Sequence, residues 1–216
     1  MKLQTDFRDL PVGERIKRIG HREYVGGSDA ETWYGIGLLQ FHFLVSRGLQ
    51  PDHVFLDVAC GCLRLGQFLI PYLEPGNYFG LEAESELVRI GLEKELNFDV
   101  AALKQPVFGH GYDFYFAFAK PFDFAIAQSL FTHLTPKDIA KCLTGARTKA
   151  HERTQFFFTF FEGDSRDNPE TSHANMNWRY SMVDLEGFAV GSGWNLEYIG
   201  DWNHPRQQMM AVARPV

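Results

Sequence analysis

Two short apolar runs, each with an acidic residue near its end, constrain this chain more than any other feature. Residues 54–58 and 78–82 have the length of strands, and they contain Asp57 and Glu82. A turn of small residues and a helical pattern over 65–73 separate the two runs. This order predicts a βαβ unit, whose parallel strands end at the same edge of a sheet. The two acids are therefore expected close together at that edge, beside the N-terminus of a helix.

The rest of the chain continues the alternation of strands and helices. Further strands are predicted from 107 onward and at 122–127, 154–161, 194–199 and 207–213. Further helices are predicted at 33–47, 85–96, 136–149 and 182–192. A short connection joins the last two strands, so that pair is expected to be antiparallel. The pattern predicts an α/β fold with a mostly parallel sheet. The polar stretch 162–180 is too long for an ordinary connection and is expected to be a functional loop.

The composition excludes several classes of protein. The 216 residues include 21 Lys and Arg against 27 Asp and Glu, a net charge of −6, and no basic stripe suited to nucleic acid is visible. Cys60, Cys62 and Cys142 make neither a disulfide framework nor a zinc-binding pattern. No apolar run approaches the length that spans a membrane. We expect a cytoplasmic protein without a resident metal and without nucleic-acid or membrane partners.

The acids and the small-residue turn point to a nucleoside site. Small residues let the backbone approach a ligand closely, and an acid at the end of the second strand can bind both hydroxyls of a ribose. Dinucleotides and S-adenosylmethionine both use this geometry. The turn lacks the glycine spacing typical of dinucleotide sites, and Asp57 would repel a pyrophosphate. The positive sulfonium and ammonium of S-adenosylmethionine are favoured there. A plain βαβ unit with coincidental acids is the third alternative.

Residues 56–61 and 80–82 resemble the first two motifs of the class I S-adenosylmethionine-dependent methyltransferases. Residues 122–134 resemble that family's fourth strand and the segment after it. Residues 25–37 and 202–207 are similar to flanks seen in an uncharacterised bacterial small-molecule subgroup. The resemblance implies a Rossmann-like seven-stranded sheet with helices on both faces and an antiparallel last strand, in agreement with the strand pattern above. It also implies a helical cap or lid over 1–50 and a methyltransferase domain over 51–216.

The resemblance also implies the residues that bind S-adenosylmethionine, whose product is S-adenosylhomocysteine. The turn after the first strand is expected to hold the methionine portion, Glu82 the ribose, the segment after the third strand the adenine, and the end of the fourth strand to lie beside the cofactor. The cofactor-binding residues expected on this basis are Asp57, Ala59, Cys60, Gly61, Glu82, Ala83, Asp113, Phe114, Gln128 and Ser129. The sequence departs from the family at Ala59 and Leu63, where glycine is usual.

The sequence says less about the residues that bind the methyl acceptor than about those that bind the cofactor. Three residues that follow predicted strands are candidate bases, namely His133, Glu162 and His204. Three aromatic residues are candidates for the acceptor pocket, namely Trp178, Tyr180 and Trp202. Either they line a pocket for a flat or apolar acceptor, or they pack in the core.

The function expected from the sequence is methyl transfer to a hydroxyl, or to an amine, of a small metabolite. A homodimer is an additional option. The alternatives are a non-catalytic nucleoside- or partner-binding module on the same fold and a nicotinamide-dependent oxidoreductase.

Overall fold

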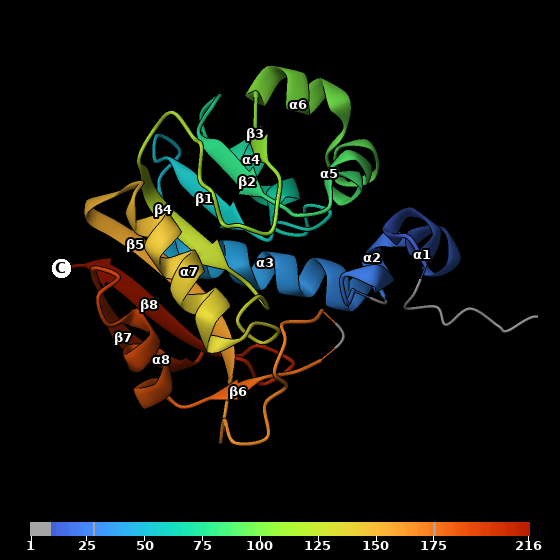
Figure 1. Cartoon of the computed structure of the whole chain (residues 1–216). Coiled ribbons are helices and arrows are strands. Elements are labelled where there is room, and N and C mark those ends of the chain that lie inside the picture. Colours follow the sequence, from blue (N-terminus) through green and yellow to red (C-terminus); the bar gives the residue numbers. More distant parts are fainter. Residues whose placement is uncertain (1–9, 28, 175) are drawn as a thin grey trace, which may run out of the picture.

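A central sheet organises the computed structural model, which describes residues 10–27, 29–174 and 176–216 (Figure 1). Its strands follow the order β3-β2-β1-β4-β5-β8-β7, and β6 pairs with β5 beside this path. The strands are β1 (Phe55–Val58), β2 (Tyr78–Leu81), β3 (Val107–Gly109), β4 (Phe122–Ala127), β5 (Ala150–Glu162), β6 (Arg179–Tyr180), β7 (Trp194–Asp201) and β8 (Met209–Pro215). The last strand, β8, lies between β5 and β7 and is antiparallel to both. The predicted α/β fold with an antiparallel last strand is confirmed.

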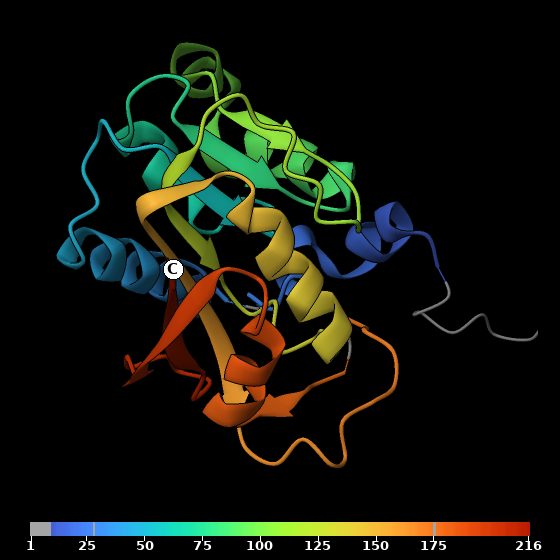
Figure 2. The same cartoon turned by 60° about the vertical axis from the view of Figure 1, so that its left-hand side comes forward.

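Helices cover both faces of this sheet (Figure 2). They are α1 (Val12–Ile19), α2 (His21–Tyr24), α3 (Ala30–Ser46), α4 (Gly66–Tyr72), α5 (Ser85–Gly91), the π-helical turn η2 (Leu92–Leu96), α6 (Phe98–Lys104), α7 (Pro136–Arg147) and α8 (Met182–Ala189). Helices α7 and α8 pack into one core cluster, and α3, α4 and α5 pack into the other.

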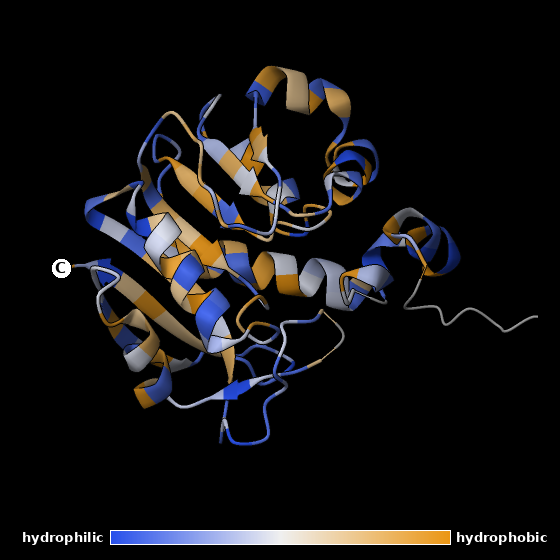
Figure 3. Ribbon diagram, viewed as in Figure 1, coloured by the Kyte–Doolittle hydropathy of each residue, from blue (hydrophilic) through white to orange (hydrophobic). Residues whose placement is uncertain are grey.

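Alternation along the strands builds these two cores. In β5, Phe156, Phe158 and Phe160 face the core under α7 and α8, whereas Phe157 faces the opposite core. This is the period of two that a strand imposes on its side chains. Figure 3 shows the hydrophobic colour concentrated on these central strands.

Side-chain caps explain where several helices begin. Thr135 accepts the backbone N–H of Asp138, and Pro136 occupies the first turn, as the sequence predicts for α7. Ser181 and Asp184 form a reciprocal capping box at the start of α8. These caps fix the helix starts that follow β4 and β6.

The structure differs from the predicted elements in a few places. The strand β5 begins at Ala150, four residues before the predicted start, because Ala150 pairs with Phe122 despite the polar residues that follow it. The short helix α6 lies in a segment where the sequence gives no clear pattern. The predicted helix 85–96 changes to π-helical geometry at Leu92. The expected loop 162–180 is irregular apart from β6 in its described part.

Two further observations concern the described residues. None of their helices combines the length and the apolar character that crossing a membrane requires. They contain no cluster of three or more His, Cys, Asp or Glu side chains arranged to bind a metal ion.

Candidate functional site

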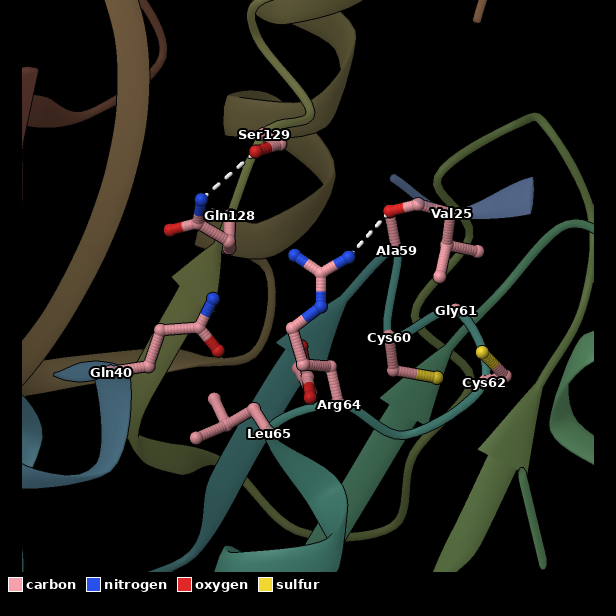
Figure 4. A pocket seen from close by; sticks show the side chains of 11 residues that line it. Val25, Gln40, Ala59, Cys60, Gly61, Cys62, Arg64, Leu65, Gln128 and Ser129 are labelled. Atoms are coloured by element: carbon pink, nitrogen blue, oxygen red, sulfur yellow. Dashed lines mark hydrogen bonds between the residues drawn. The ribbon is translucent and has the colours of Figure 1, made fainter. Parts of the chain in front are cut away.

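A small cleft of about 80 Å³ opens at the carboxyl ends of β1 and β4 (Figure 4). Residues from four parts of the fold line it, and they are Val25, Gln40, Asp57, Ala59, Cys60, Gly61, Cys62, Arg64, Leu65, Gln128 and Ser129. Six of them, Asp57, Ala59, Cys60, Gly61, Gln128 and Ser129, are among the residues predicted from the sequence. The cleft lies where parallel α/β sheets bind their ligands.

The turn after β1 forms one wall of the cleft. Ala59, Gly61 and Leu63 all have left-handed backbone angles, with φ of 60°, 56° and 67°. The N–H groups of Ala59 and Cys60 both donate to the carbonyl of Leu81, which ties the turn to β2. Left-handed geometry favours glycine, so the structure explains why glycine is usual at positions 59 and 63 of the family's motif.

Asp57 is a buried acid in the cleft, with 4% of its surface exposed. The hydroxyl of Tyr78 donates to its Oδ2 across 2.7 Å. Burial raises the pKa of Asp57 to about 7, although the Tyr78 hydrogen bond opposes this shift. A positively charged ligand group beside Asp57 would favour its ionised form.

Glu82 follows β2 and folds back onto the turn. Its carboxylate accepts the backbone N–H groups of Gly61, at 2.9 Å, and of Glu84, at 3.1 Å. Burial raises the pKa of Glu82, and these two N–H donors partly offset the rise. Glu82 and the adjacent Ala83 lie at the expected edge of the sheet but do not line the cleft.

Gln128 and Ser129 at the end of β4 belong to a polar network. Gln208 Oε1 lies 3.0 Å from Gln128 Nε2, and it accepts the hydroxyls of Ser129 at 3.0 Å and Thr159 at 2.8 Å. The Nε2 atoms of Gln128 and His204 lie 3.2 Å apart. Gln128 Oε1 is buried and has no hydrogen-bond partner among the described residues. Because a buried polar atom without a partner is costly, this oxygen is suited to bind a ligand.

Sequence reasoning missed Arg64 and Gln40, which also point into the cleft (Figure 4). Gln40 is a buried amide on α3, with 2% of its surface exposed. Arg64 precedes α4, and its Nη2 donates to the carbonyl of Val25 across 2.5 Å. The available signal for Arg64 was an arginine between two core leucines, and for Gln40 it was a glutamine on the apolar face of the helix predicted at 33–47.

The two candidate histidines differ in their surroundings. His204 is buried, stacks on Trp202 at 5.2 Å between ring centres, and has its pKa lowered by burial to about 4. His133 Nδ1 lies 2.6 Å from the carbonyl of Met176, and burial also lowers the pKa of His133. Arg206 lowers both pKa values further, so both imidazoles lie near this guanidinium.

Solved structures of methyltransferases share this architecture. The magnesium protoporphyrin IX methyltransferase of Synechocystis, solved with bound S-adenosylmethionine, is 14% identical with a TM-score of 0.61, over 84% of this chain and 81% of its own. An S-adenosylmethionine-dependent methyltransferase of Clostridium acetobutylicum is 12% identical with a TM-score of 0.64, over 95% and 99%. The glycopeptide N-methyltransferase MtfA is 13% identical with a TM-score of 0.64, over 83% and 90%. The chain has the fold of the class I methyltransferases. No protein-family model matches its sequence.

Several predicted residues lie elsewhere in this methyltransferase fold. Asp113 is exposed and accepts the N–H of Tyr115, and Phe114 packs against the core under α7. Both follow β3, yet neither lines the cleft. Glu162 is exposed at the end of β5 and accepts the Tyr198 hydroxyl at 3.1 Å.

The three aromatic residues proposed for the acceptor pocket are packed instead. Trp178 and Tyr180 are fully buried in the core, and they donate to the carbonyls of Pro169 and Leu134. Trp202 donates to the carbonyl of Gln208 at 2.9 Å and supports the network described above. Because their polar atoms are satisfied by backbone, these side chains form structure rather than cleft walls.

Proposed function

We propose that this protein transfers a methyl group from S-adenosylmethionine to a hydroxyl, or to an amine, of a small metabolite. The fold is that of proteins named as methyltransferases of a porphyrin and of a glycopeptide. The observation that carries the proposal is the cleft, which combines a buried acid, a turn of small residues and a buried amide oxygen that no described residue hydrogen-bonds.

These residues fit the cofactor's chemistry. S-adenosylmethionine supplies a methyl group that its sulfonium already activates, so the protein mainly binds and aligns. Asp57 is placed to attract the positive charge of the methionine portion, and the backbone of residues 59–61 allows close approach. Glu82 would bind the ribose by exchanging its present N–H donors for hydroxyls. Gln128 would turn its free oxygen toward the ligand.

We propose His133, which does not line the cleft, as the base for a hydroxyl acceptor. When its Nδ1–H donates to the Met176 carbonyl, Nε2 is left as the unprotonated nitrogen. Its lowered pKa keeps the imidazole neutral at pH 7 and able to accept a proton. His204, with a pKa of about 4, is a weak base, and we assign it the positioning of Gln128.

Residues 1–50, of which 1–9 and 28 lie outside the described residues, are proposed as a cap over the cofactor. Val25 and Gln40 from this part line the cleft. We further propose a cytoplasmic protein, with a homodimer as an option.

Calorimetric titration with S-adenosylhomocysteine tests the proposal. We expect binding by the wild-type chain and none of NAD, because Asp57 opposes a pyrophosphate. Asp57→Asn should weaken binding about 10-fold or more, as expected for loss of a charge-assisted contact. The matched control is Asp123→Asn, which changes an acid that accepts the N–H of Val54 at the opposite edge of the sheet. If the chain binds NAD and not S-adenosylhomocysteine, the result would favour a nicotinamide-dependent oxidoreductase over a methyltransferase.

Release of S-adenosylhomocysteine in the presence of phenol, alcohol and amine acceptors distinguishes an enzyme from a binding module. With a hydroxyl acceptor, His133→Ala should lower kcat about 10²-fold while cofactor affinity is retained. Unchanged turnover at saturating acceptor would remove His133 from the mechanism.

A further inference from the structure

The guanidinium of Arg64 extends into the cleft between Val25 and Gln128 (Figure 4). Its Nη2 donates to the carbonyl of Val25, and the group lies over the ring of Trp33, 5.0 Å from its centre. Its Nε is buried and has no hydrogen-bond partner within the part of the chain that the structure describes. Arg64 therefore keeps one buried donor, its Nε–H, that no described protein group satisfies.

Arg64 is also a half-buried charge without a counter-charge among the described residues. No acidic side chain among residues 10–27, 29–174 and 176–216 forms an ion pair with it. Burial, together with the nearby Arg206, lowers the pKa of Arg64 to about 10, which leaves it protonated at neutral pH. Buried arginines normally bind a carboxylate or phosphate through their forked donors. A cation held in this way indicates a binding site for an anionic group.

The cleft thus presents two opposite charges to one ligand. Asp57 offers a carboxylate and Arg64 offers a guanidinium, and both line the same space. The amino-acid end of S-adenosylmethionine carries an ammonium and a carboxylate, so it complements both. A phosphate would match Arg64 but would be repelled by Asp57.

We propose that Arg64 binds the methionyl carboxylate of the cofactor, opposite Asp57, and thereby selects nucleosides that carry an amino-acid end. This inference rests on the proposed function. The carbonyl of Val25, which now accepts from Arg64, is an uncharged acceptor that a carboxylate would replace or supplement. The segment 25–27, hereafter the strap, is then coupled to cofactor binding through the same guanidinium.

Two ligands isolate the carboxylate by calorimetry. One is S-adenosylhomocysteine, and the other is its decarboxylated analogue, 5′-(3-aminopropylthio)-5′-deoxyadenosine, which keeps the ammonium. The wild-type chain should prefer the first by about 10- to 100-fold, the range expected for hydrogen bonds to a charged group. Arg64→Gln should lose most of this preference and bind the decarboxylated analogue within about threefold of wild type. Arg64→Lys should recover part of the preference, because it restores a point charge without the fork.

Arg206→Gln is the matched control. Arg206 also donates to a strap carbonyl, that of Gly26, but it does not line the cleft. Its replacement should leave the preference for the carboxylate unchanged, which separates recognition from strap attachment. Thermal unfolding of each variant checks that the fold is retained.

Two results would overturn the proposal. If Arg64→Gln and Arg64→Lys both keep the full wild-type preference, Arg64 does not bind the carboxylate, while the methyltransferase proposal stands. If the wild-type chain binds neither nucleoside, both proposals fail together.

Discussion

The buried carboxylate of Asp57 is proposed to help bind the cofactor, but its charge destabilises the folded protein. Burial raises its pKa from an ordinary 3.8 to about 7. Between these two values the native chain holds a proton that the unfolded chain has lost. The free energy of unfolding therefore falls as pH rises from about 4 to 7. Above pH 7 the folded protein carries a buried carboxylate whose charge destabilises the fold.

Asp57→Asn should consequently stabilise the protein at pH 8. The gain is expected to be up to about 4 kcal/mol, since each unit of raised pKa corresponds to about 1.4 kcal/mol. Asn can still accept the Tyr78 hydroxyl. Urea unfolding at pH 8 and pH 5 measures the effect, which should be clearly smaller at pH 5. An equal or larger gain at pH 5 would contradict the raised pKa.

The left-handed backbone of the turn after β1 leads to a prediction about the stability of a variant at Ala59. Ala59 has φ of 60°, which is strained for alanine but free for glycine. Ala59→Gly should raise the free energy of unfolding by about 0.5–1 kcal/mol after the extra entropy of glycine in the unfolded chain is subtracted. The control is Ala125→Gly in the extended, buried strand β4, which should destabilise the protein. Loss of stability in both variants would mean that the turn does not hold this geometry.

At the scale of elements, one buried glutamate joins the N-terminal helices to the rest of the fold. Glu95 in η2 has 1% of its side chain exposed and accepts His21 at 2.6 Å and Arg22 at 2.7 Å. The indole of Trp33 donates to it at 3.1 Å. Burial opposes ionisation, but the hydrogen bonds from Arg22 and His21 lower the pKa of Glu95 overall. Glu95 thus anchors α2 directly, whereas Ile16 of α1 packs in an apolar cluster with Leu87 and Ile90.

Glu95→Gln should loosen these helices locally. Breaking a buried pair costs about 3–5 kcal/mol. Hydrogen exchange should therefore accelerate at least about 10-fold over residues 12–24, up to full loss of protection, and change little in α7. The matched control is Glu86→Gln, which breaks an exposed pair with Arg89 and should have almost no effect. Unchanged exchange over 12–24 in Glu95→Gln would show that other contacts hold the helices.

The helices and strands that the sequence predicts correctly are those marked by a pattern within a short stretch of consecutive residues. The strand β4 matches its predicted range, and the acids and small residues of the β1 turn sit within one contiguous motif. Helix α6 buries none of its residues, so it has no apolar face for a periodic pattern to show. Arg64 follows the same turn and was missed for lack of a motif position, whereas Gln40 and Gln208 reach the site through packing of distant segments. Trp178 packs in the core, the second of the two alternatives that the sequence leaves open, because burial rather than residue type decides whether an aromatic ring lines a cavity.

For the molecule as a whole, the size of the cleft leads us to expect movement on ligand entry. Pockets that hold ligands of this class have volumes of roughly 300–1,000 Å³, whereas the cleft measures about 80 Å³. Val25 of the strap lines it, and Arg64 and Arg206 both donate to strap carbonyls. Opening of the strap would break both contacts and widen the cleft.

Arg206→Gln should make this opening easier. Stopped-flow fluorescence should then show S-adenosylhomocysteine associating and dissociating several-fold faster than in the wild type, because the strap is released more often. Arg153→Gln, at the groove on the opposite edge of the sheet, should leave both rates unchanged. Rates that do not respond to loss of Arg206 would show that strap opening does not limit binding.

The position of β8 has a consequence for biosynthesis. This strand is the last in chain order, yet it separates β5 from β7 within the sheet. During translation, β5 and β7 have no shared partner until residues up to 215 have left the ribosome. A nascent chain stalled before that point would expose two unpaired strand edges, which are prone to aggregation and are typical targets of chaperones.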